Sequence, residues 1–216
     1  YHWQLFSSSM KSNKVNRAWI HEHVNDFYVK QAQKAGYRSR AAYKLIEIAE
    51  RDQLFSPGMI VVDLGAAPGS WSQVCRERIG KSGKIIALDL LNMLPLDGVA
   101  FIQGDFSEEK VCEMIENQLA GELADLILSD MSPNLAGIGM SDQARSINLA
   151  ELALAFANNK LKPGGSFLVK IFQGSYVDQY IRDMRFHFNK VMIRKPKASR
   201  SKSKELYLLG LGKIIC

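Results

Sequence analysis

Apolar and polar positions along the chain follow two periods, one typical of buried strands and the other of amphipathic helices. Short, nearly continuous apolar runs predict seven strands, at residues 59–63, 84–89, 99–103, 126–129, 166–172, 190–194 and 206–211. Apolar residues at three- and four-residue spacing predict helices over residues 39–52, 70–79, 107–118, 143–161 and 176–188. Because strands alternate with helices, we expect an α/β domain with a mostly parallel sheet and helices on both faces.

The same pattern divides the chain into three parts. Residues 1–12 show no periodicity, and we interpret them as an expression remnant or a disordered end. Residues 13–38 form a basic N-terminal segment with interleaved aromatic side chains, in which the pattern indicates neither a helix nor a strand. Residues 39–216 are expected to form one domain, with Ser39 capping its first helix and a turn at residues 162–165 ending its long one.

Composition limits the class of protein. The chain has 216 residues, of which 47% are hydrophobic and 23% charged, as in an ordinary globular domain. Its apolar runs are shorter than the roughly 20 residues that a membrane-spanning helix needs. Cys75, Cys112 and Cys216 are scattered, which favours neither a disulfide framework nor a zinc site. We therefore expect a cytoplasmic protein without a bound metal.

Charge is segregated along the chain. Residues 1–44 contain eight Lys or Arg and two Asp or Glu, and residues 190–204 contain seven basic residues and no acid. Residues 45–189 contain twelve basic and nineteen acidic residues. Two basic segments flanking an acidic middle indicate either contact with a polyanion or a pair of solvated tails.

The clearest candidate site is the stretch Val61-Val62-Asp63-Leu64-Gly65-Ala66-Ala67-Pro68-Gly69-Ser70-Trp71. It reads as a strand, a loop of small residues and the start of a helix, which is typical of a nucleotide-cofactor site. The spacing of its glycines differs from the dinucleotide fingerprint, and it lacks the lysine of a phosphate-binding loop. Asp89 and Asp105 end the next two strands, where they could bind ribose hydroxyls and an adenine amine, with Phe106 against the ring. Asp63 could bind a cofactor amine or orient the loop, and together these acids favour S-adenosylmethionine.

This loop, extended through Ser72-Gln73, resembles the cofactor motif of the FtsJ/RlmE family of RNA ribose 2′-O-methyltransferases. The similarity continues through Asp26-Phe27-Tyr28-Val29-Lys30, residues 37–45 and Ser129-Asp130-Met131-Ser132-Pro133-Asn134, and covers residues 13–212. Ser70 is a departure, since members often have a second glycine there. The resemblance implies a Rossmann-like, S-adenosylmethionine-dependent methyltransferase fold. It also implies a catalytic set that here matches Lys44, Asp130, Lys170 and Glu205. The expected cofactor-binding residues are Asp63, Gly65, Ala67, Pro68, Gly69, Trp71, Asp89, Asp105, Phe106 and Asp130.

The role of Lys170 stays open in the sequence. A free lysine is protonated at neutral pH, so it could act as a base only if desolvation or a neighbouring cation such as Lys44 favours the neutral amine. Asp130 and Glu205 favour the charged form, in which Lys170 would orient the ribose hydroxyl instead.

The basic segments lead into this set of residues and are expected to bind RNA phosphates. The residues concerned are Lys30, Lys34, Arg38, Arg40, Lys195, Lys197, Arg200 and Lys202. The resemblance implies a uridine of 23S rRNA in the large ribosomal subunit as the substrate, and we expect a monomer. Two alternatives are a tRNA 2′-O-methyltransferase of the same family and a non-catalytic RNA-binding factor in ribosome assembly.

Overall fold

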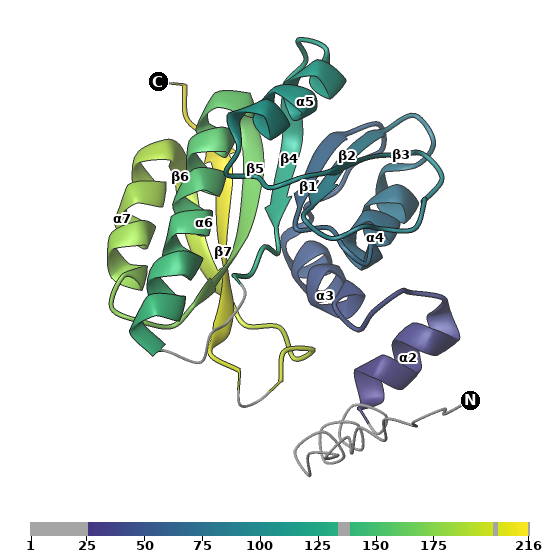
Figure 1. The fold of residues 1–216 in the computed structure, drawn as a ribbon, viewed down its shortest axis with the longest axis horizontal. Helices are drawn as coiled ribbons and strands as arrows, with labels where there is room; N and C mark the ends of the chain where they lie inside the picture. The colour runs from purple at the N-terminus through teal and green to yellow at the C-terminus, as the bar shows by residue number, and fades with distance from the viewer. Residues whose placement is uncertain (1–25, 134–138, 201–202, 216) are drawn as a thin grey trace, which may run out of the picture.

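The computed structural model describes residues 26–133, 139–200 and 203–215 of the chain. Its strands form one seven-stranded sheet in the order β3-β2-β1-β4-β5-β7-β6 (Figure 1). The strands are β1 (Ile60–Leu64), β2 (Lys84–Asp89), β3 (Val99–Gln103), β4 (Ala124–Ser129), β5 (Leu161–Phe172), β6 (Phe188–Arg194) and β7 (Glu205–Lys213). The seven strands predicted from the apolar runs are all present.

The first five strands run parallel to one another, and the last strand, β7, runs in the opposite direction. β1 pairs with β2 and β4, β2 pairs with β3, and β4 pairs with β5, all in parallel. β7 lies between β5 and β6 and is antiparallel to both. Its register sets Glu205 opposite Phe172 and Tyr207 opposite Lys170. The start of β7 therefore lies at the carboxyl end of β5.

Helices cover both faces of the sheet, as predicted (Figure 1). α5, α6 and α7 pack on one face, where Ile115, Ala153 and Met184 are fully buried. α3 and α4 pack on the other face around Leu45 and Val74. The described helices are α2 (Phe27–Ala35), α3 (Ala42–Asp52), α4 (Ser70–Ile79), α5 (Glu109–Leu119), α6 (Gly139–Lys160) and α7 (Val177–His187). Over the ranges that the structure describes, no helix has both the length and the apolar character of a membrane span.

The helix α2 was missed by the sequence pattern. Its start is fixed by Asp26, whose carboxylate accepts hydrogen bonds from the backbone N–H groups of Tyr28 and Val29 at 2.9 and 3.3 Å. Gly36 ends it in the left-handed region, with φ at 79°. Only Val29 and Ala32 are buried along this helix. Local capping, not an apolar stripe, defines this element.

Several predicted boundaries also differ by a few residues, two of them at a predicted cap and a predicted turn. Ala41, not Ser39, is the N-cap of α3, and the helix begins at Ala42. The Ser39 hydroxyl instead accepts a hydrogen bond from the Ala41 N–H in the preceding turn and forms another with the Ser70 hydroxyl at 2.7 Å. The turn expected at residues 162–165 is an irregularity at the start of β5, with a register shift against β4.

Candidate active site

A cavity of about 480 Å³ lies at the carboxyl edge of the sheet, where parallel strands β1 to β5 end. Loops that leave this edge form most of its wall, which is the usual place for a nucleotide cofactor in such sheets. The lining residues are Gly65, Ala67, Leu88, Asp89, Leu90, Leu91, Gly104, Asp105, Phe106, Asp130, Met131, Ser132, Pro133, Leu149 and Lys170. Three of the acids predicted from the sequence, Asp89, Asp105 and Asp130, are thus gathered in one place.

The loop between β1 and α4 approaches the end of β4 closely. Gly65 has φ at 79°, and a Cβ atom there would lie 2.7 Å from the backbone nitrogen of Met131. A glycine is therefore required by both the backbone conformation and the available space. Asp89 fixes the other side of the loop, since its carboxylate accepts from the N–H groups of Ala67 and Leu91, both at 2.8 Å.

Asp105 and Phe106 form the far wall of the cavity. The Asp105 carboxylate accepts from both the hydroxyl and the N–H of Ser107, at 2.7 and 2.9 Å, and these hydrogen bonds lower its pKa. Phe106 is buried, and its ring makes an edge contact with Phe156 of α6 at a centroid distance of 5.5 Å. Asp105 thus has a structural partner in Ser107 as well as a position in the cavity wall.

Four predicted cofactor residues lie outside this lining: Asp63, Pro68, Gly69 and Trp71. Asp63 is completely buried and accepts a hydrogen bond from the Ser72 hydroxyl at 2.6 Å. Burial raises the pKa of Asp63 to about 7, although the bond from Ser72 lowers it, and the charges of Asp130 and Asp89 add to the increase. Trp71 is also buried, and its indole N–H donates to the Ala41 carbonyl at 2.8 Å. These contacts support the loop from beneath.

The apolar part of the wall was not found from the sequence. Leu88, Leu90, Leu91, Met131 and Leu149 line the cavity beside the acids. A search for polar groups passes over such residues. Two of them follow Asp89 directly and one follows Asp130, so the positions next to acids at strand ends carried a usable signal.

Lys170 and Asp130 form a tight pair at the inner end of the cavity. The Lys170 ammonium donates to the Asp130 carbonyl at 2.6 Å and lies 3.1 Å from its carboxylate. The Tyr207 hydroxyl donates to the same carboxylate oxygen, Oδ1, at 2.9 Å. Burial, and then the negative charge of Asp130, raise the pKa of Tyr207 far above its usual value, which keeps the phenol a donor. Asp130 is thereby held between a cation and a hydroxyl.

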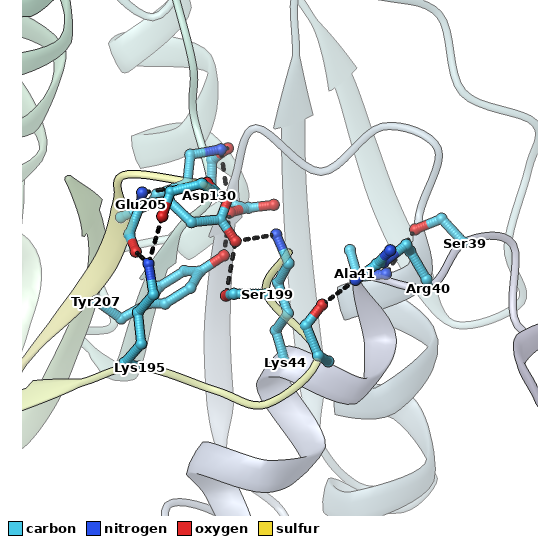
Figure 2. Close-up of polar contacts among 12 residues, drawn as sticks. Ser39, Arg40, Ala41, Lys44, Asp130, Lys195, Ser199, Glu205 and Tyr207 are labelled. Atoms are coloured by element: carbon cyan, nitrogen blue, oxygen red, sulfur yellow. Dashed lines mark hydrogen bonds and ion pairs between the residues drawn. The ribbon is translucent and has the colours of Figure 1, made fainter. Parts of the chain in front are cut away.

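Lys44 and Glu205 form a second pair on the other side of Tyr207. The Lys44 ammonium lies 2.6 Å from Glu205 Oε1, which also accepts from the Ser199 hydroxyl at 2.7 Å (Figure 2). Burial favours a higher pKa for Glu205, but the charge and hydrogen bond of Lys44, the bond from Ser199 and the charge of Lys170 together hold it below its usual range. The Lys44 nitrogen is also 6.0 Å from the Tyr207 ring centroid, within cation–π range.

The two lysines are thus each paired with a carboxylate. From the sequence, the positive charge of Lys44 could have favoured the neutral form of Lys170. In the structure Lys44 is neutralised by Glu205, and Lys170 by Asp130. Close carboxylates favour the ammonium form of a lysine. The geometry therefore suits Lys170 as a fixed hydrogen-bond donor in the resting site.

A second pocket, also of about 480 Å³, adjoins the Lys44–Glu205 pair. Three of its four charged lining residues are basic, and the pocket joins the start of α3 to the loop before β7. The residues are Ser39, Arg40, Ala41, Lys44, Arg200, Ser203 and Glu205. Burial lowers the pKa of Arg40, and the nearby charge of Arg200 lowers it further. Arg40 already pairs with Asp26 and Lys44 with Glu205, so an anion in this pocket would pair chiefly with Arg200.

The predicted RNA-binding residues fall into two groups. Lys30, Lys34 and Lys197 are exposed, and Arg200 lines the second pocket. The other three described residues bond to the protein itself. Arg38 donates to the carbonyls of Pro68, Leu94 and Pro95, and Lys195 donates to those of Ser203 and Glu205. Arg40 donates to the Ala198 carbonyl and forms an ion pair with Asp26. Lys202, like residues 1–12, lies outside the described residues.

A parallel α/β sheet with an antiparallel seventh strand and an acid-lined cavity at its carboxyl edge defines the class of Rossmann-like methyltransferases. The chain belongs to the FtsJ-like methyltransferase family, whose model matches residues 37–213. It is therefore a methyltransferase, as predicted. Members of this family generally use S-adenosylmethionine.

Relatives in other organisms agree with this membership. The chain is 62% identical over 206 residues to the ribosomal RNA large subunit methyltransferase E of Nitrosomonas europaea, covering 95% of this chain and all of the relative. The enzyme of the same name from Chromobacterium violaceum is 55% identical over 204 residues, covering 94% of this chain and all of the relative. A crystal structure described as a ribosomal RNA methyltransferase of Plasmodium falciparum is 32% identical with a TM-score of 0.74, covering 82% of this chain and 98% of the other.

Proposed function

We propose that this chain transfers a methyl group from S-adenosylmethionine to a ribose 2′-hydroxyl of 23S rRNA, at a uridine of the large ribosomal subunit. One observation carries the proposal. The Lys170–Asp130 pair lines the acidic cavity, while Tyr207 links it to the Lys44–Glu205 pair that lines the basic pocket. A cofactor side and a polyanion side therefore meet at one set of catalytic groups.

The residues of the cavity fit S-adenosylmethionine by their chemistry. Carboxylates at Asp89, Asp105 and Asp130 suit a ligand that carries ribose hydroxyls, an adenine amine and a net positive charge. Leu90, Leu91 and Phe106 supply apolar surface for a purine ring. We assign these residues to cofactor binding, and assign Asp63, Pro68, Gly69 and Trp71 to support of the loop.

When bound, S-adenosylmethionine supplies the methyl group as an electrophilic sulfonium. The protein has to hold the ribose hydroxyl in line with that group and help remove its proton. An ammonium has three hydrogens, and the Asp130 carbonyl and carboxylate engage two of the positions around Lys170 Nζ. When Lys170 is an ammonium, its third N–H can donate to the hydroxyl oxygen. When it is a neutral amine, the lone pair in that position can accept the hydroxyl proton. Asp130 and Tyr207 fix the direction in which Lys170 points.

The basic pocket supports RNA as the substrate. Arg200, with the exposed Lys30, Lys34 and Lys197, offers charge for backbone phosphates beside Lys44 and Glu205. The names of the close relatives support ribosomal RNA of the large subunit in particular. A protein with this substrate would act in the bacterial cytoplasm, and we propose that it acts as a monomer.

The test is to map methyl groups after incubation with labelled S-adenosylmethionine. Large ribosomal subunits, free 23S rRNA and tRNA are offered separately, each from cells that lack the endogenous enzyme. We expect label on the ribose of one uridine in large-subunit rRNA, identified as a 2′-O-methylated nucleoside by mass spectrometry. Label confined to tRNA would support the tRNA alternative. Tight rRNA binding without any label would support a non-catalytic assembly factor.

A further inference from the structure

Arg38 lies in the basic N-terminal segment, but its guanidinium is engaged by the protein. Nη1 donates to the Pro68 carbonyl at 3.0 Å and to the Leu94 carbonyl at 2.8 Å. Nη2 donates to the Pro95 carbonyl at 2.8 Å. Carbonyls from two different loops therefore engage three of the five N–H donors of the guanidinium.

The two loops that Arg38 joins are two walls of the acidic cavity. Pro68 follows Ala67 in the loop after β1, and Leu94 and Pro95 lie in the same connection as Leu90 and Leu91. Ala67, Leu90 and Leu91 line the cavity, whereas Arg38 does not. Arg38 can therefore act on a ligand in the cavity only through the position of these walls.

The fit between Arg38 and the first loop is close. Gly69 has φ at 107°, and a Cβ atom there would lie 2.7 Å from Arg38 Nη1 and 2.8 Å from the Met93 sulfur. The backbone of Arg38 is also fixed, because its N–H donates to the side-chain oxygen of Gln73 at 2.8 Å. The backbone of Arg38 is thus anchored by α4, and its guanidinium lies against a residue without a side chain.

We propose that Arg38 is a positioning residue for the cofactor and not a contact for RNA phosphates. It sets the separation of the two cavity walls, as Asp89 does from the other side through its bonds to Ala67 and Leu91. The identity of the cofactor rests on the proposed function, but the role of Arg38 in shaping the cavity rests on its own contacts.

Arg38→Lys separates the two roles because it keeps the positive charge. A lysine can still bind a phosphate as a point charge, but a single ammonium cannot reproduce the planar fork that reaches three carbonyls. If Arg38 sets the separation of the two cavity walls, that function should therefore be lost in Arg38→Lys as well as in Arg38→Ala. An RNA-phosphate role would be preserved largely by lysine and lost with alanine.

Arg76 provides a matched control at the opposite edge of the same sheet. Its guanidinium donates to the carbonyls of Gly83 and Gly98, at 3.0–3.2 Å, just before β2 and β3. A Cβ atom at Gly98 would lie 2.7 Å from Arg76 Nη1, the same fit as at Gly69. Arg76→Lys thus removes an equivalent clamp at the other end of the β2–β3 connection, through residues outside the cavity lining.

The experiment compares the full-length wild type with Arg38→Lys, Arg38→Ala and Arg76→Lys. Calorimetry measures the Kd for S-adenosylmethionine, filter binding measures the Kd for 23S rRNA, and kinetics give KM for the cofactor and kcat at saturation. Both Arg38 variants should raise the cofactor Kd and KM at least about tenfold. Their rRNA affinity and saturated kcat should stay within about twofold of wild type, and Arg76→Lys should leave the cofactor Kd unchanged.

The outcomes are distinguishable. If Arg38→Lys binds cofactor like the wild type while Arg38→Ala loses rRNA affinity, Arg38 contacts RNA and the proposal is overturned. If Arg76→Lys weakens cofactor binding as much as Arg38→Lys, the effect is general destabilisation and the proposal also fails. Thermal unfolding of each variant shows whether it is folded. A wild type that binds no S-adenosylmethionine would refute the proposed function instead.

Discussion

The two pockets that Tyr207 links, one lined by the Asp130–Lys170 pair and the other by the Lys44–Glu205 pair, are built in different ways. The acidic cavity is lined mainly by strand ends and by the loops that directly follow them, and backbone N–H groups hold two of its acids, Asp89 and Asp105. The basic pocket joins segments far apart in the sequence, for example Arg40 and the Ala198 carbonyl, 158 residues away. Side-chain ion pairs such as Lys44–Glu205 hold it together. The first pocket is set by local strand–loop geometry, the second by tertiary assembly.

This difference is visible in two buried acids. Asp63, beneath the cofactor loop, is surrounded by apolar strands and other acids, and its pKa rises to about 7. Glu205, at the basic pocket, is surrounded by lysines and a hydroxyl, and its pKa falls below the usual range. Burial acts in the same direction on both, so the neighbouring charges decide the outcome.

The strongest test of the comparison is at Lys170, which lines the acidic cavity. Lys170→Ala removes the group that we assign to the ribose hydroxyl, as proton acceptor or hydrogen-bond donor, and we expect kcat to fall by about 10²–10⁴-fold, the range for loss of acid–base assistance. The cofactor Kd should change little, because Asp89 and the loop after β1 remain in place. Single-turnover methylation and calorimetry give the two quantities. A variant that keeps near-normal turnover would remove Lys170 from the mechanism.

The second prediction concerns how the free energy of unfolding depends on pH, and it compares Asp63 with Glu205. Between its ordinary value of 3.8 and about 7, Asp63 keeps a proton in the folded protein that the unfolded chain has lost. Its contribution to stability therefore decreases as the pH rises from about 4 to 7, by up to about 4 kcal/mol for a shift of this size. Asp63→Asn should flatten that dependence relative to wild type, as measured by urea unfolding at a series of pH values.

Glu205→Gln provides the contrast. Because its folded pKa is lowered, Glu205 contributes stability that is present above its ordinary value of 4.5 and lost as the pH falls through the folded pKa. This variant should differ from wild type in its pH dependence only below about pH 5. If both variants altered the same pH window, the opposite environments of the two acids would be contradicted.

Most of the fold could be predicted because its signals are local. The strands at residues 84–89 and 99–103 and the helix at residues 70–79 agree with β2, β3 and α4 at both ends. Acids or glycines flank these apolar runs in the sequence, and they define where each strand or helix begins and ends. α2 escaped prediction because its stability depends on the Asp26 cap and few buried side chains. The sequence order also could not reveal that β7 lies between β5 and β6.

The site was predictable to the extent that its residues sit at strand ends. Asp89, Asp105 and Asp130 follow from that rule, since parallel strands bring their carboxyl ends to one edge. Tyr207 was missed, because its bond to Asp130 depends on the register of an antiparallel strand 77 residues further along the chain. Charge alone could not separate Arg38, which binds carbonyls of its own protein, from Arg200, which lines the basic pocket.

The smallest expected effect concerns that basic pocket. Arg200→Ala removes one charge from the lining, and we expect rRNA affinity to fall a few-fold at moderate salt. The slope of log affinity against log salt should become shallower by about one, because one fewer phosphate contact releases counterions. Arg185→Ala, an exposed residue in the last turn of α7, serves as the control and should leave the slope unchanged. Cofactor affinity should depend little on salt in all three proteins, since the acidic cavity contacts no polyanion. An unchanged slope for Arg200→Ala would mean that the second pocket does not hold the RNA backbone, and the division between the two pockets would need to be drawn elsewhere.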